Sequence, residues 1–250
     1  MLPFCCSVRF CLVVHNGLLL ALHAHTHMRA HTALSHAFAQ ALHPVLRGKD
    51  TVITAETGSG KTLCYVIPFL ARRMAWKAAQ ATEEGQHTSA RVTGRPRMLV
   101  VVPSQELCAQ VADVVCSIDK SADAYIVSVK RAPSIRRLQA ADVVVATPQA
   151  ALRTVGRVAA SVNTATADAS STHEPLLPYE MVVLDEADLL IGSFKAQVEQ
   201  VLTEATREYR DVNKDRGGPQ HIMCAVRSDV ALPLAWPWFG CLLTPRPTVV

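Results

Sequence analysis

The sequence contains no Asp or Glu in its first 49 residues and no Cys-x-x-Cys pair anywhere. The missing Cys pair argues against a zinc ribbon and against a thioredoxin-type redox site, because both use two thiols at this spacing. The eight cysteines are scattered, which favours reduced thiols over a disulfide framework. The net charge of +4 over 250 residues is compatible with nucleic-acid binding but too small to predict it.

The acid-free N-terminal region, residues 1–36, looks different from the rest of the chain. Its apolar stretch is interrupted by Arg9 and by polar residues, so it is a poor match to a membrane span of about 20 apolar residues. Five histidines that could bind Zn²⁺ or Ni²⁺ lack a completing Cys or acidic ligand. They are His23, His25, His27, His31 and His36. We interpret this region as disordered, as an organelle-targeting segment or as translated non-coding sequence. We expect an intracellular protein without stable membrane association, and organelle, nucleus and cytoplasm stay open.

From residue 51, short β-branched apolar runs alternate with segments of helical character. The predicted strands are 51–54, 98–102, 125–129, 143–146, 181–184 and 222–226. The predicted helices are 61–75, 105–118, 134–140, 149–159 and 195–208. This alternation predicts an α/β fold with an open, mostly parallel sheet, helices on both faces, and ligands at the carboxyl ends of the strands. The polar segments 77–97 and 161–178 are predicted to be surface loops.

A glycine-rich stretch, residues 55–62, lies between a predicted strand and a predicted helix. Its glycines permit a tight turn whose N–H groups point at an anion, and the helix adds the positive end of its dipole. In such a loop Lys61 reaches the β- and γ-phosphates and the Thr62 hydroxyl ligates Mg²⁺. The general pattern opens with Gly, where this chain has Ala. We expect these residues to bind the nucleotide: Ala55, Glu56, Thr57, Gly58, Ser59, Gly60, Lys61 and Thr62.

A second acidic motif follows the apolar run 181–184. In a phosphate-loop fold, an Asp at the tip of a neighbouring strand holds Mg²⁺, and a following Glu polarises the attacking water. Asp185 and Glu186 stand at these positions. The alternative is an acidic helix start after a buried strand, which the helix dipole also favours.

These two motifs together resemble those of DEAD-box ATP-dependent RNA helicases, in their first RecA-like domain. That family begins its phosphate loop with Ala and spells the second motif Asp-Glu-Ala-Asp, as residues 185–188 do. Residues 103–110 and 144–148 resemble motifs on the family's RNA side, and residues 48–50 resemble the turn before the phosphate-loop strand. The resemblance covers about residues 38–226 and implies a RecA-like P-loop NTPase domain, which we assign to residues 37–227.

The resemblance also implies roles for individual residues. ATP and Mg²⁺ would be the cofactors, with Lys61, Asp185 and Glu186 catalytic, Asp185 holding Mg²⁺ through water, and Glu186 activating the hydrolytic water. Asp188 would couple this loop to a later Ser-Ala-Thr motif, and Gln40 is the nearby candidate for reading adenine. RNA, single-stranded or duplex, would be bound through its backbone, without sequence preference. The matching positions on the RNA side are Pro103, Glu106, Thr147 and Pro148.

The chain also departs from the family pattern. Gln105 stands where the family has Arg, and Gln149–Ala150 replaces a Gly-Arg pair. Arg131–Ala132 replaces a Gly-Gly pair, and residues 225–227 replace Ser-Ala-Thr. Residues 228–250 do not resemble the fold, and we expect the second RecA-like domain to be missing. We therefore expect weak activity from this chain alone. A degenerate, non-catalytic ATP- and RNA-binding fragment or scaffold is the alternative, and a DNA helicase or another phosphate-loop ATPase is a third.

Overall fold

The computed structural model describes residues 12–14, 18–20, 36–83, 95–155, 178–213, 218–226 and 248–249. The chain divides into two units, residues 1–33 and residues 34–250. In the first unit, β1 (Leu12–Val14) pairs antiparallel with β2 (Leu18–Leu20). The described residues do not include His23, His25, His27 and His31 of the histidine cluster, residues 84–94 of the predicted loop 77–97, or residues 161–177 of the predicted loop 161–178.

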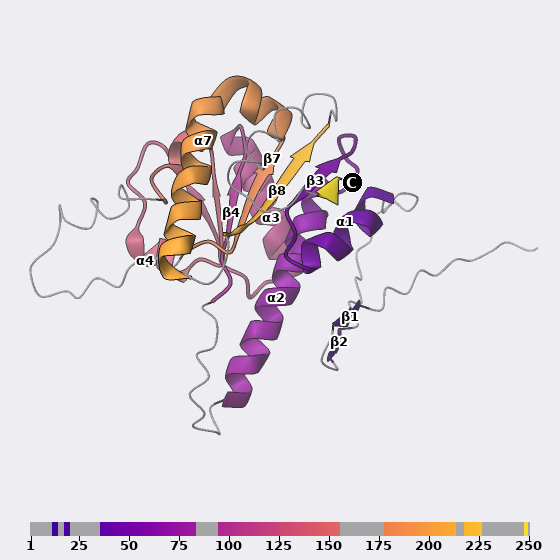
Figure 1. The fold of residues 1–250 in the computed structure, drawn as a ribbon. Helices are drawn as coiled ribbons and strands as arrows, with labels where there is room; N and C mark the ends of the chain where they lie inside the picture. The colour runs from indigo at the N-terminus through magenta and orange to yellow at the C-terminus, as the bar shows by residue number, and fades with distance from the viewer. Residues whose placement is uncertain are drawn as a thin grey trace, which may run out of the picture. The chain divides into compact units, whose positions relative to one another are not determined.

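The second unit is built on a seven-stranded parallel sheet with the strand order β5-β6-β4-β7-β8-β3-β9 (Figure 1). The strands are β3 (Thr51–Thr54), β4 (Met98–Val101), β5 (Ala124–Val127), β6 (Val143–Ala146), β7 (Met181–Asp185), β8 (Gln220–Ala225) and β9 (Thr248–Val249). This arrangement confirms the predicted α/β fold with an open parallel sheet.

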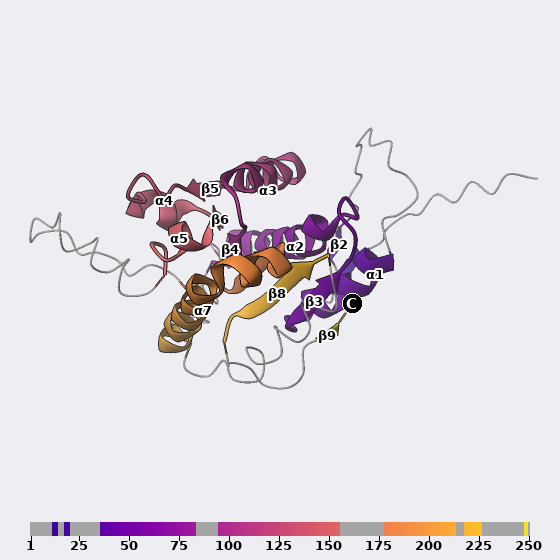
Figure 2. The same cartoon turned by 90° about the horizontal axis from the view of Figure 1, so that it is seen from above.

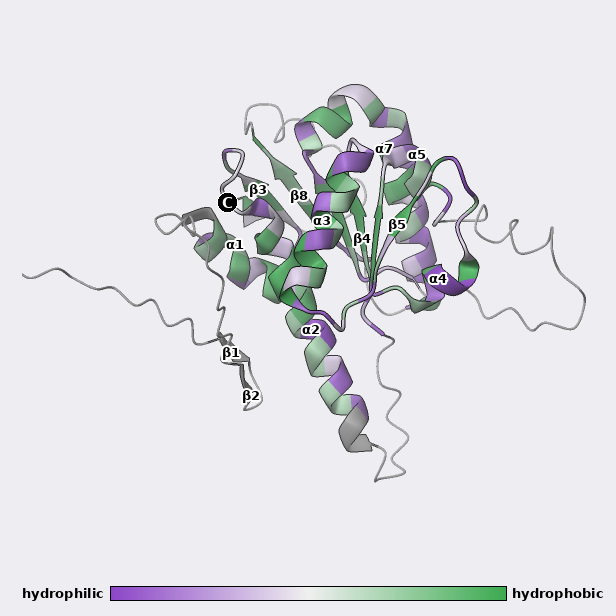
Figure 3. Cartoon of the chain, turned by 180° about the vertical axis from the view of Figure 1, so that it is seen from behind, coloured by the Kyte–Doolittle hydropathy of each residue, from purple (hydrophilic) through white to green (hydrophobic). Residues whose placement is uncertain are grey.

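Helices cover both faces of the sheet (Figure 2). One face packs against α1 (His36–Leu46), α2 (Lys61–Glu83) and α3 (Gln105–Ile118). The other face packs against α4 (Ile135–Ala140), α5 (Pro148–Ala151) and α7 (Ala187–Val212). The strands between these layers are mostly hydrophobic (Figure 3), because strands that are buried on both faces are rich in apolar residues. The polar residues Gln220 and His221 at the start of β8 are exceptions.

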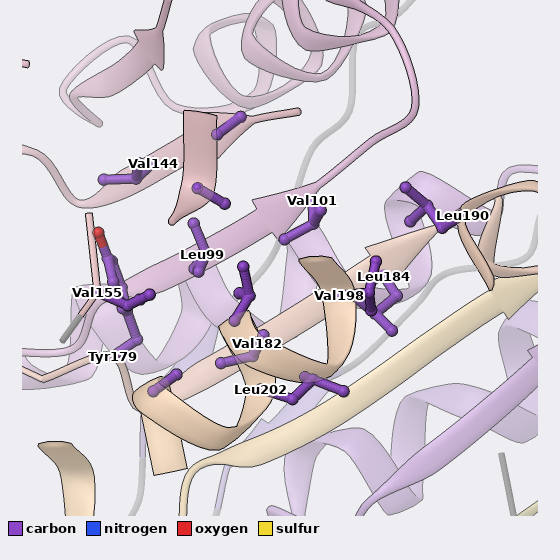
Figure 4. Packing of buried hydrophobic residues seen from close by; sticks show 14 of the residues in the cluster. Leu99, Val101, Val144, Val155, Tyr179, Val182, Leu184, Leu190, Val198 and Leu202 are labelled. Carbon is purple, nitrogen blue, oxygen red and sulfur yellow. The ribbon is translucent and has the colours of Figure 1, made fainter. Parts of the chain in front are cut away.

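Alternate strand residues supply the two cores. In β4, Leu99 and Val101 belong to the core under α7, whereas Met98 and Val100 belong to the core under α2 and α3. Figure 4 shows the first of these cores, in which strand side chains pack against Leu190, Val198 and Leu202 of α7. Burying one large aliphatic side chain contributes about 1.5–3 kcal/mol, so these two cores are the main stabilising feature of the domain.

Several predicted boundaries were wrong. The helix predicted to end at residue 75 continues to Glu83, so residues 77–83 are not loop; alanines, the best helix formers, are frequent in this part. α5 ends at Ala151, so residues 152–155 of the helix predicted over 149–159 are not helical, and residues 156–159 lie outside the described part of the chain. The helix predicted over 195–208 begins at Ala187 and ends at Val212, and non-helical backbone angles at Phe194 interrupt its regular pattern.

The edge strand β9 was not anticipated, because residues 228–250 were expected to lie outside the fold. Thr248 and Val249 pair in parallel with Thr51 and Val52, and the Thr248 N–H donates to the Asp50 carbonyl at 3.0 Å. Residues 227–247 lie outside the described part of the chain. Among the described helices, none combines the length and apolar character needed to cross a membrane.

A buried ion-pair cluster ties α2 to the amino ends of β5 and β6. The Arg73 guanidinium lies 2.7 Å from Asp119 and 2.7 Å from Asp142. Arg95 also pairs with Asp142 at 2.6 Å. Two arginines therefore neutralise the buried Asp142 carboxylate at the edge of the sheet opposite the carboxyl ends of the strands.

Candidate nucleotide and nucleic-acid site

The carboxyl edge of the sheet gathers the predicted site residues. β7, β8 and β3 are neighbours, so their carboxyl ends bring together residues 185–188, residue 226 and the loop 55–62. β4 and β6, the next strands on the other side of β7, lead into Pro103 and Thr147. Apart from Gln40 on α1, the predicted nucleotide and RNA residues thus occupy adjoining parts of one edge, where open parallel sheets bind their ligands.

The loop between β3 and α2 has the backbone of a phosphate cradle. Gly58 has φ 78° and Gly60 has φ 85°, values that side-chain-bearing residues rarely adopt. A Cβ at Gly58 would meet no atom within 4 Å, and one at Gly60 would lie 3.8 Å from Leu63 Cδ1. The left-handed backbone, rather than lack of space, therefore favours glycine at both positions.

The Lys61 side chain turns back into this loop. Its Nζ donates hydrogen bonds to the Ala55 carbonyl at 2.6 Å and to the Glu56 carbonyl at 2.8 Å. Lys61 is only 9% exposed. The ammonium group is thus held inside the concave side of the loop, the position from which it could donate to phosphate oxygens in place of the carbonyls.

Asp185, at the carboxyl end of β7, faces the first turn of α2. Its Oδ2 accepts from the Tyr65 hydroxyl at 2.7 Å and from Thr62 Oγ1 at 3.4 Å, and its Oδ1 accepts from the Glu186 N–H at 3.0 Å. Burial raises the pKa of Asp185, and these hydrogen bonds together with nearby Lys61 partly offset the increase. A cation at this carboxylate would favour the ionised form.

The donor atoms present fit Mg²⁺. Thr62 and Asp185 offer two hard oxygens, and Mg²⁺ commonly takes one or two protein oxygens while substrate phosphates and water complete its coordination. In the described part of the chain, no group of three or more His, Cys, Asp or Glu side chains is placed to hold a metal by itself. A metal at Asp185 would therefore depend on the nucleotide for its remaining ligands.

Glu186 adopts an unusual backbone conformation. Its φ of 56° and ψ of 48° are left-handed, and it caps the start of α7. Strain of this kind in a non-glycine residue costs about 1–2 kcal/mol and is often found at functional sites. Burial and the neighbouring Asp185 and Asp188 raise the pKa of Glu186, which makes its carboxylate a better proton acceptor.

Asp188 connects this loop to the residue after β8. Its Oδ2 accepts from the Val226 N–H at 3.4 Å. The sequence predicted a link from Asp188 to the later family motif, and the two segments do meet, through a backbone N–H in this chain. The coupling role of Asp188 stays a prediction.

The predicted RNA residues lie where strands β4 and β6 lead into helices. Ser104 caps α3 by accepting from the Leu107 N–H at 3.3 Å, and Glu106 follows in the exposed first turn. Backbone hydrogen bonding, followed by Ser104, lowers the pKa of Glu106, which keeps it ionised. Thr147 and the buried Pro148 begin α5, and Pro103 is half-buried. Their contacts with RNA stay predictions.

Gln40, the predicted adenine-reading residue, is exposed on α1. α1 itself packs against both α2 and β3, the two elements that flank the phosphate loop. Its role also stays a prediction.

Two residues that support the site were missed in the sequence. Tyr65 stands four residues after Lys61 on α2. This spacing places two side chains on one face of a helix, and it is the sequence pattern that could have pointed to Tyr65. Gln220 of β8 donates to the Val45 carbonyl at 3.0 Å and to the Lys49 carbonyl at 2.7 Å. It fixes the turn before β3 across about 170 residues of sequence, and no local pattern reveals such a contact.

The family model and the curated relatives that match this chain are all helicases of one family. A sequence model of the DEAD/DEAH box helicase family matches residues 36–224. Probable ATP-dependent RNA helicase DDX28 of Mus musculus is 32% identical over 170 residues, covering 65% of this chain and 27% of that protein. DEAD-box ATP-dependent RNA helicase 50 of Arabidopsis thaliana is 31% identical over 179 residues, covering 68% of this chain and 20% of that protein. The chain therefore spans about a quarter of the length of these curated relatives.

Solved structures share the fold. A hypothetical ATP-dependent RNA helicase from Sulfolobus tokodaii aligns with a TM-score of 0.56 at 23% identity, covering 88% of this chain and 53% of that one. Dbp5 L327V of S. cerevisiae, solved with RNA and ADP BeF3, aligns with a TM-score of 0.57 at 16% identity, covering 86% of this chain and 45% of that one. The family match extends over most of the described α/β unit, including both loops of the site, and the chain belongs to the DEAD/DEAH box helicase family.

Proposed function

We propose that this chain is the ATP-binding part of an ATP-dependent RNA helicase. It binds Mg-ATP between α2 and β7, it binds the RNA backbone at the adjoining ends of β4 and β6, and hydrolysis is coupled to unwinding in the full-length enzyme. One observation carries the proposal: the phosphate loop and the acidic motif, 123 residues apart, meet through Thr62 and Asp185 at 3.4 Å.

Each residue of the nucleotide site has a distinct task in this proposal. Lys61 exchanges its carbonyl partners for phosphate oxygens, and the loop N–H groups bind the same anion. Thr62 and Asp185 hold Mg²⁺, which when bound neutralises charge on the phosphates. Tyr65 keeps the Asp185 carboxylate in place, and Glu186, with its raised pKa, accepts a proton from the attacking water.

Directly paired strands connect the proposed nucleotide site to the proposed RNA site. β7, which carries Asp185, pairs with β4, which leads into Pro103 and Glu106. β4 in turn pairs with β6, which leads into Thr147 and Pro148. The names of the curated relatives and the RNA in the Dbp5 structure support RNA as the partner. In the full-length enzyme a second RecA-like domain would complete both sites.

A non-catalytic ATP- and RNA-binding scaffold is the second candidate. It is favoured by the neutral side chains of Gln105 and Ala150, which stand at arginine positions of the family motifs, and by Val226, which offers Asp188 only a backbone N–H. Loss of turnover with retained binding is the property that distinguishes this candidate from an enzyme.

A titration with a fluorescent ATP analogue tests the proposal. We expect Mg²⁺-dependent binding by the wild type, strongly weakened binding by Lys61→Ala, and unchanged binding by Lys195→Ala, whose side chain is 60% exposed on α7. Absence of Mg²⁺-dependent binding by the wild type would contradict the proposed ATP site.

Hydrolysis of ATP in the presence of RNA then separates the two candidates. If the chain is an enzyme, Glu186→Gln should bind the analogue like the wild type but hydrolyse ATP more slowly. Equal rates for the wild type and Glu186→Gln, at the level of the buffer alone, would support the scaffold.

A further inference from the structure

Arg72 belongs to a hydrogen-bonded network at the amino edge of the sheet. Its Nη2 donates to the Val45 carbonyl at 2.7 Å and to Gln220 Oε1 at 2.5 Å. The Gln220 amide in turn donates to the same Val45 carbonyl at 3.0 Å and to the Lys49 carbonyl at 2.7 Å. Arg72 and Gln220, which we call the α1 anchor, therefore connect α2 and β8 to the end of α1 and to the turn that follows it.

The α1 anchor completes the carboxyl end of α1. The last four carbonyls of a helix have no partner within the helix. Gly48, whose φ of 72° is left-handed, donates from its N–H to the Val45 carbonyl at 3.0 Å, and the Lys49 N–H donates to the Pro44 carbonyl at 3.0 Å. Arg72 adds a positive charge at this end, where the helix dipole is negative. The end of α1 is thus held on α2 and β8 by side chains as well as by its own turn.

Arg72 is too far from the phosphate loop to contact a nucleotide bound there. It stands eleven residues after Lys61 on α2, which corresponds to about 16 Å along the helix axis. Arg72 can therefore act on the nucleotide site only through the elements that it holds in place.

α1 extends from this anchored end toward the phosphate loop. A short turn joins the end of α1 to the start of β3, and α1 packs against both β3 and α2 (Figure 2). The 11 residues of α1 span about 16 Å, whereas the 4 residues of β3 span about 13 Å. α1 is therefore long enough to reach from the amino end of β3 to the loop at its carboxyl end. A displacement of the anchored end would move the part of α1 beside the loop as well.

We propose that Arg72 is a positioning residue for the base of the bound nucleotide. Together with Gln220 it holds α1, which lies on the side of the nucleotide site away from Asp185, because β8 separates β3 from β7. This inference rests on the proposed function and extends it to base recognition, for which Gln40 on α1 is the predicted contact. Lys61 and the loop hold the phosphates, so loss of the α1 anchor should weaken binding of the base and leave binding of the phosphates unchanged.

Isothermal titration calorimetry of the full chain with two ligands separates the base from the phosphates. Mg-ATP has a base, a ribose and three phosphates, whereas Mg-tripolyphosphate has the three phosphates alone. We expect Arg72→Met and Gln220→Leu to bind Mg-ATP at least about fivefold more weakly than the wild type, which is the lower end of the usual coupling between separate sites. Their affinity for Mg-tripolyphosphate should be unchanged. The double variant should show the loss of a single variant, because both substitutions break one network.

Arg95→Met is the matched control. Arg95 also donates to carbonyls at the end of a helix, to Gln139 at 3.3 Å and to Ala140, but this helix is α4, on the opposite face of the sheet from α1. We expect the control to bind both ligands like the wild type, and circular dichroism verifies that every variant is folded. Arg72→Lys keeps the charge and a donor for the Val45 carbonyl, so it should lose less affinity for Mg-ATP, and it replaces Arg72→Met if that variant does not fold.

Two results would overturn the positioning role and leave the proposed function intact. One is an equal weakening of both ligands, or unchanged Mg-ATP binding, in the variants of the α1 anchor. The other is a selective loss of Mg-ATP affinity in Arg95→Met. Wild-type binding of Mg-ATP that is no tighter than binding of Mg-tripolyphosphate would overturn the role of α1 in base binding. Failure of the wild type to bind either ligand would overturn the ATP site of the proposed function itself.

Discussion

The hydrogen bond between Tyr65 and Asp185 leads to a quantitative prediction. Tyr65 is fully buried, and its hydroxyl donates to Asp185 Oδ2 at 2.7 Å. A hydrogen bond to a charged group contributes about 1.5–3 kcal/mol. In a domain of this size each kcal/mol corresponds to a change in melting temperature of about 2–4 °C. Tyr65→Phe should therefore lower the melting temperature by about 3–12 °C at a pH where Asp185 is ionised.

The same substitution should also weaken Mg²⁺-dependent nucleotide binding. The Tyr65 hydrogen bond lowers the pKa of Asp185 against the larger effect of burial, so its loss favours the protonated carboxyl group. A protonated Asp185 does not bind Mg²⁺ well, and the pH at which binding is half-maximal should therefore move upward. Titration of a fluorescent ATP analogue over a range of pH measures this change.

Tyr125→Phe is the control for this experiment. The Tyr125 hydroxyl accepts a neutral hydrogen bond from the Ser134 N–H at 3.2 Å, on the edge strand β5. Its loss should cost about 0.5–1.5 kcal/mol and leave nucleotide binding unchanged. The reasoning is refuted if Tyr65→Phe binds the nucleotide with the pH profile of the wild type.

Unfolding measurements on four other positions test the geometry further. Gly60→Ala should lose about 1–2 kcal/mol in urea unfolding, because its φ of 85° disfavours a side chain although the space is open. Glu186→Gly should be more stable than Glu186→Ala in the same assay by about 1 kcal/mol, because glycine relieves the strain at φ 56°. Arg73→Met should lose about 3–5 kcal/mol, because it breaks two buried ion pairs; a loss below about 1 kcal/mol would contradict this. Finally, burial raises the pKa of Asp185 above its unfolded value. Without nucleotide, the free energy of unfolding should therefore increase as the pH falls through this raised pKa. Asp185→Asn should remove that part of the pH dependence of unfolding.

The sequence predicts the sheet well for a physical reason. Strands buried on both faces need continuous apolar runs, and the runs 51–54 and 143–146 coincide with β3 and β6. The helix over 105–118 coincides with α3, which starts directly after its capping residue Ser104. The boundaries of α7 could not be predicted in the same way, because the irregular backbone at Phe194 hides one long helix from a search for regular periodicity.

The motifs of the site can be predicted from local sequence, whereas the contacts between them cannot. The phosphate loop and the acidic motif are local patterns, and the strand order then brings them together. Tyr65 and Asp185 are 120 residues apart, and their contact depends on the side-by-side placement of α2 and β7. β9 is a two-residue strand that directly follows Pro245 and Pro247, a context that does not predict a strand, so pairing with β3 gives it its structure.

A crystal structure of the chain with Mg²⁺ and a non-hydrolysable ATP analogue tests the central claim most directly. We predict that Lys61 Nζ leaves the Ala55 and Glu56 carbonyls for phosphate oxygens, that Mg²⁺ lies about 2.0–2.1 Å from Thr62 Oγ1, and that Asp185 holds it directly or through water. A nucleotide bound elsewhere, or phosphates in the loop with Lys61 still on its two carbonyls, would contradict the account.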